Sequence, residues 1–429
     1  MIKSSLFGFS FSLLSWLTLW VSPFALSEQF SVSTGGQLAA TLSMAQDGDA
    51  VQLEPGRYTG HFIIDSAITL DGQGQATIDA QGTGNAIEVR SDRTHLKNLR
   101  IQNWGHDLTH TSSGIKAVGV KQLQIEHNDL AGDGFGIYLE QVSDSVVSDN
   151  AIQGNAALRS ADRGNGVHLI SVSGVEVSGN RINATRDGLY IINSQHNSLL
   201  NNHMSDLRFG VHYMYSHSNR VDGNAARQVR VGYALMSSND LSITNNSADD
   251  CSDYGLLLNF VNTSYIAHNS IHSIHADSTK AIQGDVGKAL FIYNALNNRI
   301  EFNTFADSDL GIHLTAGSEG NVLTQNNFIN NQTQVKYVST REQEWSLNQQ
   351  GNFWSNYMGW DLDHNGIGDT AFAPNDGVDK LIWRYPEARV LMDSPAVLLL
   401  RWVQKSFPIL KSPGVTDSYP LLDLAGGSS

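Results

Sequence analysis

Between about residues 97 and 337 the chain returns roughly every 22 residues to one pattern of short alternating stretches, an Asn, polar turn residues and a Gly. The recurrent asparagines are Asn128, Asn150, Asn180, Asn202, Asn224, Asn246, Asn269, Asn303 and Asn327. The recurrent small residues are Gly114, Gly136, Gly166, Gly188, Gly210, Gly232, Gly255, Ala289 and Gly311. Two markers that stay in register indicate a true repeat, interrupted by two insertions of about 8 and 12 residues.

A unit of this length holds two or three short strands and cannot bury its own apolar face, so successive units must stack. The strands at 136–140 and 210–214 alternate with period two and no helical stretch separates them. This favours an all-β solenoid, a right-handed parallel β-helix, over a leucine-rich repeat. We expect the repeated asparagines to form a ladder along coils about 4.8 Å apart, in left-handed turn positions. A helix at 37–45 is expected to cap the N-terminal end.

The chain also divides into segments by composition. Lys3, an apolar run to Val21 and small residues up to Ser27 predict a signal peptide at 1–27, with a membrane anchor as the alternative. A capped β-helix is expected at 28–345, a loop-rich segment at 346–385 and a helical docking tail at 386–429. The apolar residues of that tail are Leu398, Leu399, Leu400 and Trp402. Their predicted partner is either the end of the β-helix or the external surface of a membrane protein.

Charge and cysteine content exclude several classes of protein. The chain has 27 Lys and Arg against 42 Asp and Glu, a net charge of −15, which argues against binding to nucleic acid or anionic lipid. Cys251 is the single cysteine, so an internal disulfide and self-contained zinc-ribbon or iron–sulfur sites are excluded.

The outward face of the repeat carries unexpected chemistry. The second and fourth residues after each repeat glycine should point outward, and they include Tyr138, His168, Tyr190, His212, Ile192, Met214 and Met236. Such a row is atypical of a solvated face. Thioether and imidazole groups select Cu(I), so the predicted copper ligands are His212, Met214, His217 and Met236, with contributions from His203 and Met204. The alternative is that these side chains pack against a partner protein.

Two further clusters stand out. Arg186, Arg208 and Arg230 precede three consecutive repeat glycines, and stacked like charges require an anionic counterpart, which is either a local Asp or a bound partner. Oxygen donors at Asp361, Asp363, Asn365 and Asp369 resemble the start of a calcium loop. Position 372 is Phe, so a full EF-hand is excluded. A reduced structural calcium site and an ordinary Asp/Asn/Gly turn both remain open.

Three segments give the sequence a family resemblance. They are GVHYMYSHSNRV at 210–221, GKALFIYNALNNRI at 287–300 and GNFWSNYMGWDLDHNGIGD at 351–369. With the leader and the apolar tail, they make the chain similar to NosD proteins over essentially the whole mature length. The resemblance implies a non-catalytic periplasmic partner of an ABC transporter permease and ATPase. It also implies that the protein receives Cu(I) from a copper-chaperone lipoprotein and supports assembly of the copper site of nitrous oxide reductase. Contact with the membrane would then run through the permease.

Two other functions are compatible with a β-helix. A secreted polysaccharide lyase, hydrolase or epimerase needs paired carboxylates or an Arg or Lys beside acid-bound calcium. The best match in this chain is the row of three arginines, Arg186, Arg208 and Arg230, with Asp187 and Asp206. A scaffold without metal is the other alternative. Cu(I) binding would distinguish the copper-handling function from the polysaccharide enzyme and from the scaffold.

Overall fold

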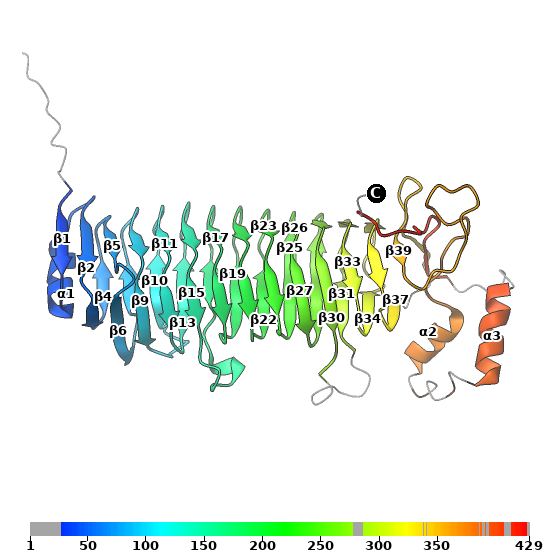
Figure 1. Cartoon of the computed structure of the whole chain (residues 1–429), viewed down its shortest axis with the longest axis horizontal. Coiled ribbons are helices and arrows are strands. Elements are labelled where there is room, and N and C mark those ends of the chain that lie inside the picture. Colours follow the sequence, from blue (N-terminus) through cyan, green and yellow to red (C-terminus); the bar gives the residue numbers. More distant parts are fainter. Residues whose placement is uncertain are drawn as a thin grey trace, which may run out of the picture.

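The computed structural model describes residues 27–277, 286–337, 339, 341–385, 387, 391, 394–406 and 413–426. These residues form a parallel β-helix whose coils stack along one axis (Figure 1). Each coil contributes one strand to each of three parallel sheets, called A, B and C here. The predicted fold class is therefore confirmed. The predicted signal peptide at 1–27 lies outside the described residues, apart from Ser27.

Sheet A has 13 strands. They are β1 (Gln29–Val32), β2 (Ala50–Leu53), β5 (Thr69–Asp71), β8 (His95–Lys97), β11 (Gln124–Glu126), β14 (Val146–Ser148), β17 (Glu176–Ser178), β20 (Ser198–Leu200), β23 (Arg220–Asp222), β26 (Ser242–Thr244), β29 (Tyr265–Ala267), β32 (Arg299–Glu301) and β35 (Val322–Thr324).

Sheet B also has 13 strands. They are β3 (Gly56–Thr59), β6 (Ala76–Thr83), β9 (Arg100–Trp104), β12 (Asp129–Ala131), β15 (Ala151–Gln153), β18 (Arg181–Asn183), β21 (His203–Ser205), β24 (Ala225–Arg227), β27 (Ser247–Cys251), β30 (Ser270–Ile274), β33 (Thr304–Ala306), β36 (Asn327–Ile329) and β39 (Phe353–Trp354).

Sheet C has 12 strands and carries the repeat glycines. They are β4 (Phe62–Ile64), β7 (Ile87–Val89), β10 (Ser113–Val118), β13 (Phe135–Glu140), β16 (Val167–Ile170), β19 (Asp187–Ile192), β22 (Phe209–Met214), β25 (Val231–Asn239), β28 (Tyr254–Asn262), β31 (Lys288–Tyr293), β34 (Leu310–Leu314) and β37 (Thr333–Tyr337). A Cβ on Gly136 would lie 2.6 Å from the carbonyl oxygen of Gly166, so the close approach of neighbouring coils explains the repeated glycine.

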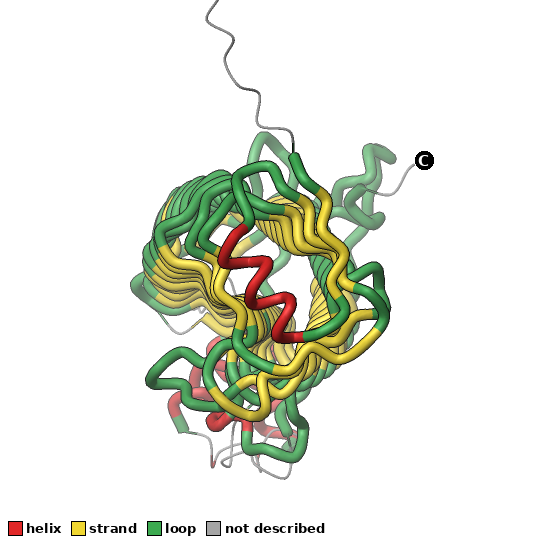
Figure 2. The backbone as a smooth tube through the Cα atoms, turned by 90° about the vertical axis from the view of Figure 1, so that its left-hand side faces the viewer, coloured by secondary structure: helices red, strands yellow, loops and turns green. Residues whose placement is uncertain are grey.

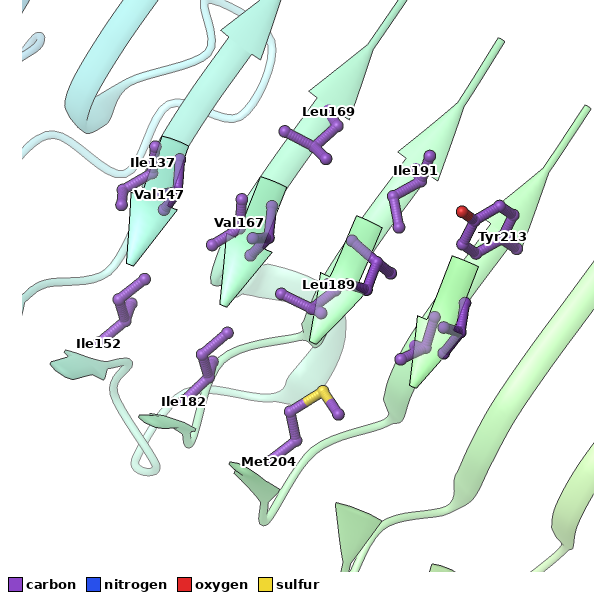
Figure 3. Packing of buried hydrophobic residues seen from close by; sticks show 14 of the residues in the cluster. Ile137, Val147, Ile152, Val167, Leu169, Ile182, Leu189, Ile191, Met204 and Tyr213 are labelled. Atoms are coloured by element: carbon purple, nitrogen blue, oxygen red, sulfur yellow. The ribbon is translucent and has the colours of Figure 1, made fainter. Parts of the chain in front are cut away.

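The interior is a continuous apolar core built from inward residues of all three sheets. Figure 3 shows these side chains as columns that run from coil to coil, such as Ile137, Val167 and Leu189. The first and third residues after each repeat glycine, which alternate with the predicted outward positions, are buried.

A ladder of buried asparagines runs beside this core. Asn202 shows the pattern: its Oδ1 accepts hydrogen bonds from the backbone N–H and Nδ2 of Asn180, while its Nδ2 donates to Val177 O and to Asn224 Oδ1. The last predicted member was wrong, because the N–H and Nδ2 of Asn303 donate to Asn326 Oδ1, and Asn327 is the next residue, in β36. The left-handed residue was also misplaced by one position: Asn201, before Asn202, has φ 53°.

Helix α1 (Gly35–Met44) covers the N-terminal end of the coil stack (Figure 2). Its N-cap Thr34 accepts a hydrogen bond from the Gln37 N–H, and its Leu38 and Leu42 are buried against the first coils. This confirms the predicted capping helix. A 3₁₀ turn (Ser160–Asp162) lies in the first of the two insertions.

The C-terminal end is closed by the segment after residue 338. Helices α2 (Gly377–Arg384) and α3 (Pro395–Ser406) pack on each other beside the last coils, and β38 (Gln343–Glu344) pairs with β40 (Val415–Thr416). Residues 413–426 then return to the β-helix, where Asp417 accepts hydrogen bonds from the Asn352 N–H and Trp354 Nε1. The tail expected at 386–429 thus contains one described helix and a capping segment. No described helix has the length and apolarity needed to cross a bilayer.

Candidate functional site

The outer surface of sheet C carries a row of aromatic rings. The row consists of Tyr138, His168, Tyr190 and His212, one from each of four successive strands. The rings of Tyr138 and His168 are stacked with centroids 5.2 Å apart, those of His168 and Tyr190 are 4.5 Å apart, and those of Tyr190 and His212 are 4.9 Å apart. The outward residues therefore cover each other along the axis, which explains why His212 is only 8% exposed.

Asp187 organises the end of this row. Its carboxylate is buried and accepts two hydrogen bonds from Arg208, through Nε at 2.8 Å and Nη2 at 2.6 Å. The same carboxylate lies 2.9 Å from His212 Nδ1. A carboxylate on Nδ1 favours the tautomer that leaves Nε2 of His212 as a lone-pair donor.

The electrostatics of the site follow from burial and pairing. Burial alone would raise the pKa of Asp187, but the hydrogen bonds from His212 and Arg208 and their charges hold it below its ordinary value. Burial lowers the pKa of His168 to about 4, so this imidazole is neutral at neutral pH. The row therefore contains the neutral imidazole of His168 near the Arg208–Asp187 pair, whose two charges compensate each other.

Two thioethers lie beside His212. Met214 and Met236 are direct register partners on neighbouring strands, as the repeat predicted. Tyr190 Oη donates to Met214 Sδ at 3.8 Å, and Met236 packs against an outer apolar cluster of Val231, Ala234 and Leu257. Both methionines are half-buried on the same surface as His212. Imidazole and thioether are groups that suit a soft monovalent ion, and copper binding by these three residues stays a prediction.

The structure does not bring every predicted ligand to this surface. Met204 is only 2% exposed and lies in the interior column with Ile152 and Ile182 (Figure 3). His203 is exposed on sheet B, which is a different wall. Both predictions were wrong because residues in β21 alternate between inside and outside, and neither direction leads to sheet C.

His217 occupies the turn between sheets C and A. Its Nδ1 accepts a hydrogen bond from the Asn239 N–H at 3.1 Å, which orients the ring along the turn. His217 lies three residues after Met214, outside the strands of sheet C, and its role as a copper ligand stays a prediction.

The three arginines have different surroundings. Arg208 pairs with Asp187, and Arg230 pairs with Asp253 at 2.5 Å. The Arg186 side chain forms no hydrogen bond or ion pair with any described residue, and its Nε is buried. Two of the three thus have local acidic partners, as one of the two interpretations expected.

The acidic loop at 361–369 satisfies its own carboxylates. Asp361 accepts from the N–H groups of Asn365 and Gly366, Asp363 accepts from Asn365, and Asp369 accepts from the Leu362 N–H. Among the described residues no group of three or more His, Cys, Asp or Glu side chains is arranged to hold a metal. The loop is a hydrogen-bonded turn, and calcium binding there stays a prediction.

The apolar residues of α3 are on the surface. Trp402 is 61% exposed and Leu399 is 60% exposed, with Leu398 and Leu400 also exposed. Arg401 instead faces α2, where it pairs with Asp376 and Asp379. These two ion pairs hold α3 against α2 with its apolar residues outward.

Sequence reasoning did not connect Asp187 with His212. It considered Asp187 only together with the arginines. By strict alternation from Gly188, Asp187 has the inward parity of Leu189 and Ile191, so the repeat contained no signal for its contact with His212.

Comparison with known proteins places the chain in a family. Residues 148–359 match the family described as periplasmic copper-binding protein (NosD), and residues 58–184 match the right-handed β-helix region. A probable ABC transporter binding protein NosD of Pseudomonas aeruginosa is 49% identical over 89% of this chain and 90% of its own length. The protein of the same description from Stutzerimonas stutzeri is 44% identical over 90% of both chains. The chain belongs to the NosD family. The NosD relatives are named as binding proteins, not as enzymes.

Solved structures share the fold of this NosD-family chain. The A-module of mannuronan C-5 epimerase AlgE6 from Azotobacter vinelandii superposes with a TM-score of 0.58 at 18% identity, over 71% of this chain and 91% of that module. The surface adhesin PfbA of Streptococcus pneumoniae gives 0.53 at 11% identity, over 71% and 88%. At these identities the likeness extends to the β-helix and not to the activity.

Proposed function

We propose that this protein handles Cu(I) in the periplasm as part of an ABC transporter system and supports assembly of the copper site of nitrous oxide reductase. The observation that carries the proposal is the juxtaposition of His212, oriented by Asp187, with Met214 and its register partner Met236. The family description as periplasmic copper-binding supports the same chemistry. Copper would be a cargo here, held by exchangeable soft donors.

The partners follow from the same proposal. An ABC permease and its ATPase would receive the protein through α3, because Leu398, Leu399 and Trp402 form an outward apolar face at one end of the molecule. A copper-chaperone lipoprotein would deliver Cu(I) to the outer surface of sheet C, and nitrous oxide reductase would accept it. The names of the relatives as ABC transporter binding proteins support a transporter association.

The copper site is tested by changing its two thioethers together. The mature protein is titrated with Cu(I) under anaerobic conditions against a chromophoric competitor. Met214→Leu combined with Met236→Leu should abolish stoichiometric Cu(I) binding, because leucine keeps the volume and removes the sulfur ligands. X-ray absorption of the wild-type complex should show sulfur and nitrogen neighbours.

Met204→Leu is the matched control, since Met204 is a buried methionine on another sheet. It should bind Cu(I) like the wild type. Unchanged affinity in the double variant would reject the site. Release of unsaturated uronate from polysaccharide by the wild-type protein would instead favour an enzyme.

A further inference from the structure

A cavity of about 700 Å³ lies on the turns between sheets B and C, next to the two insertions in the repeat. Ser160 and Ala161 of the first insertion line one end, and Ala276 and Val286 line the other. The loop around the 3₁₀ turn projects from this side of the β-helix (Figure 1). Arg186, Arg208 and Arg230 follow one another between these two ends.

The cavity is locally basic on an acidic protein. Five basic residues and three acidic residues line it, whereas the whole chain carries a net charge of −15. Most of these charges already have partners. Arg163 donates to the carbonyl oxygens of Leu158, Ala184 and Ala156, and Arg208 and Arg230 bind Asp187 and Asp253.

Arg186 is the exception among the basic residues of the lining. Its side chain has no hydrogen-bond or ion-pair partner among the described residues, although its Nε is fully buried. Asp206 also lines the cavity, but no ion pair joins it to Arg186. An unpaired buried guanidinium donor costs free energy until an acceptor arrives, and its planar fork matches a carboxylate.

We infer that this cavity binds an acidic peptide segment of a partner protein, with one carboxylate on Arg186. Arg208 and Arg230 are paired with aspartates, but among the described residues Arg208 Nη1 and both Nη atoms of Arg230 have no hydrogen-bond partner. With Arg186 they place donors on three consecutive coils, spaced by about 4.8 Å per coil, which suits a ligand with several carboxylates better than one compact anion. Tyr254 is the aromatic ring in the lining, and Lys288 Nζ lies over it at 4.8 Å from the centroid. Its face is therefore occupied by a cation, which disfavours stacking of a sugar ring.

Arg208 takes part in both proposals, but Arg186 does not contact His212, Met214 or Met236, so the peptide site tested at Arg186 and the copper site tested at Met214 and Met236 can fail separately. Because the protein is acidic overall, a polyanion is repelled in general and only a local site can hold it. Binding of acidic peptide by the unmodified protein is therefore informative in itself.

The test measures fluorescence anisotropy of labelled hexaglutamate with the copper-free mature protein at low salt. Arg186→Gln should weaken binding at least tenfold, about 1.4 kcal/mol, and Arg186→Lys should weaken it less, because it keeps the charge and loses the fork. Arg181→Gln is the matched control, since Arg181 is exposed on sheet B and does not line the cavity. It should leave binding unchanged. Thermal melts verify that each variant is folded.

Several results would overturn the inference. They are absence of hexaglutamate binding, equal loss in the Arg181 and Arg186 variants, or inorganic sulfate that binds as tightly as the peptide. Tighter, Arg186-dependent binding of an oligouronate than of hexaglutamate would reassign the cavity to an acidic polysaccharide.

Discussion

Asp187 connects the arginine row, through Arg208, with the outward histidine and methionine residues, through His212. Its carboxylate binds Arg208, whose side chain also lies over the Phe209 ring at 4.4 Å, and it orients His212. Removal of this one group would leave a buried imidazole and a half-buried guanidinium without their acceptor. At this scale the copper proposal depends on a carboxylate that is not itself a ligand.

His168 makes folding stability depend on pH. Its pKa is about 4 in the folded protein and about 6.5 in an unfolded chain, so below pH 6.5 the unfolded chain takes up a proton that the folded one does not. Stability is therefore complete above pH 6.5 and is lost as pH falls toward 4, by about 2 kcal/mol at pH 5. His168→Gln should reduce the fall in melting temperature between pH 7 and pH 5.

The exposed His203 supplies the control for this measurement. His203→Gln should retain the wild-type pH dependence. Burial also lowers the pKa of His313, to about 3, so the His168 variant should keep a part of the effect. An unaltered pH dependence in the His168 variant would contradict the assignment.

At the scale of elements, the asparagine ladder fixes one coil on the next. Each side chain satisfies backbone groups of the preceding coil, as Asn202 does for the Asn180 N–H and Val177 O, so the ladder supplies hydrogen bonds that a turn cannot make by itself. The ladder continues past the β-helix repeat through Asn326 to Asn352, which Asp417 then caps. It therefore links the regular coils to the C-terminal cap.

Asn202→Ala should destabilise the protein by about 2–4 kcal/mol, because it leaves the N–H of Asn180 buried without an acceptor and removes the donor to Val177 O. Thermal unfolding followed by circular dichroism measures the effect. Asn183→Ala is the control: this half-buried residue makes no described side-chain hydrogen bond and should change stability by less than about 0.5 kcal/mol. Equal effects of the two substitutions would refute the role of the ladder.

At the scale of the molecule, the loop of the 3₁₀ turn lies on the same side of the β-helix as the helices α2 and α3 (Figure 1). Ser160 and Ala161 of this loop line the cavity. One face thus combines a basic cavity with an apolar helix, whereas the histidine and methionine residues lie on sheet C. Truncation at residue 386 would remove Asp417 together with α3, so it cannot separate docking from folding.

Substitution on α3 avoids that problem. The combination Leu398→Gln, Leu399→Gln and Trp402→Gln should abolish co-purification with the permease complex while the melting temperature changes little, because all three side chains are exposed. Met44→Gln, at an exposed position of α1 at the opposite end, is the matched control and should still co-purify. Retention of the triple variant in the complex would exclude docking through α3.

The sequence by itself determined the coil, its register and the direction of most side chains. A period of 22 residues with glycine and asparagine marks permits only stacking, and stacking places Met214 beside Met236 whatever the rest of the chain does. The sequence also contained the signal that Met204 points inward, because the second residue after each ladder asparagine is apolar, as at Ile152 and Ile182. Only the tertiary structure decided that Asp187 serves both Arg208 and His212 and that Arg186 is left without a partner, since side chains from different coils compete for one carboxylate and geometry settles the outcome.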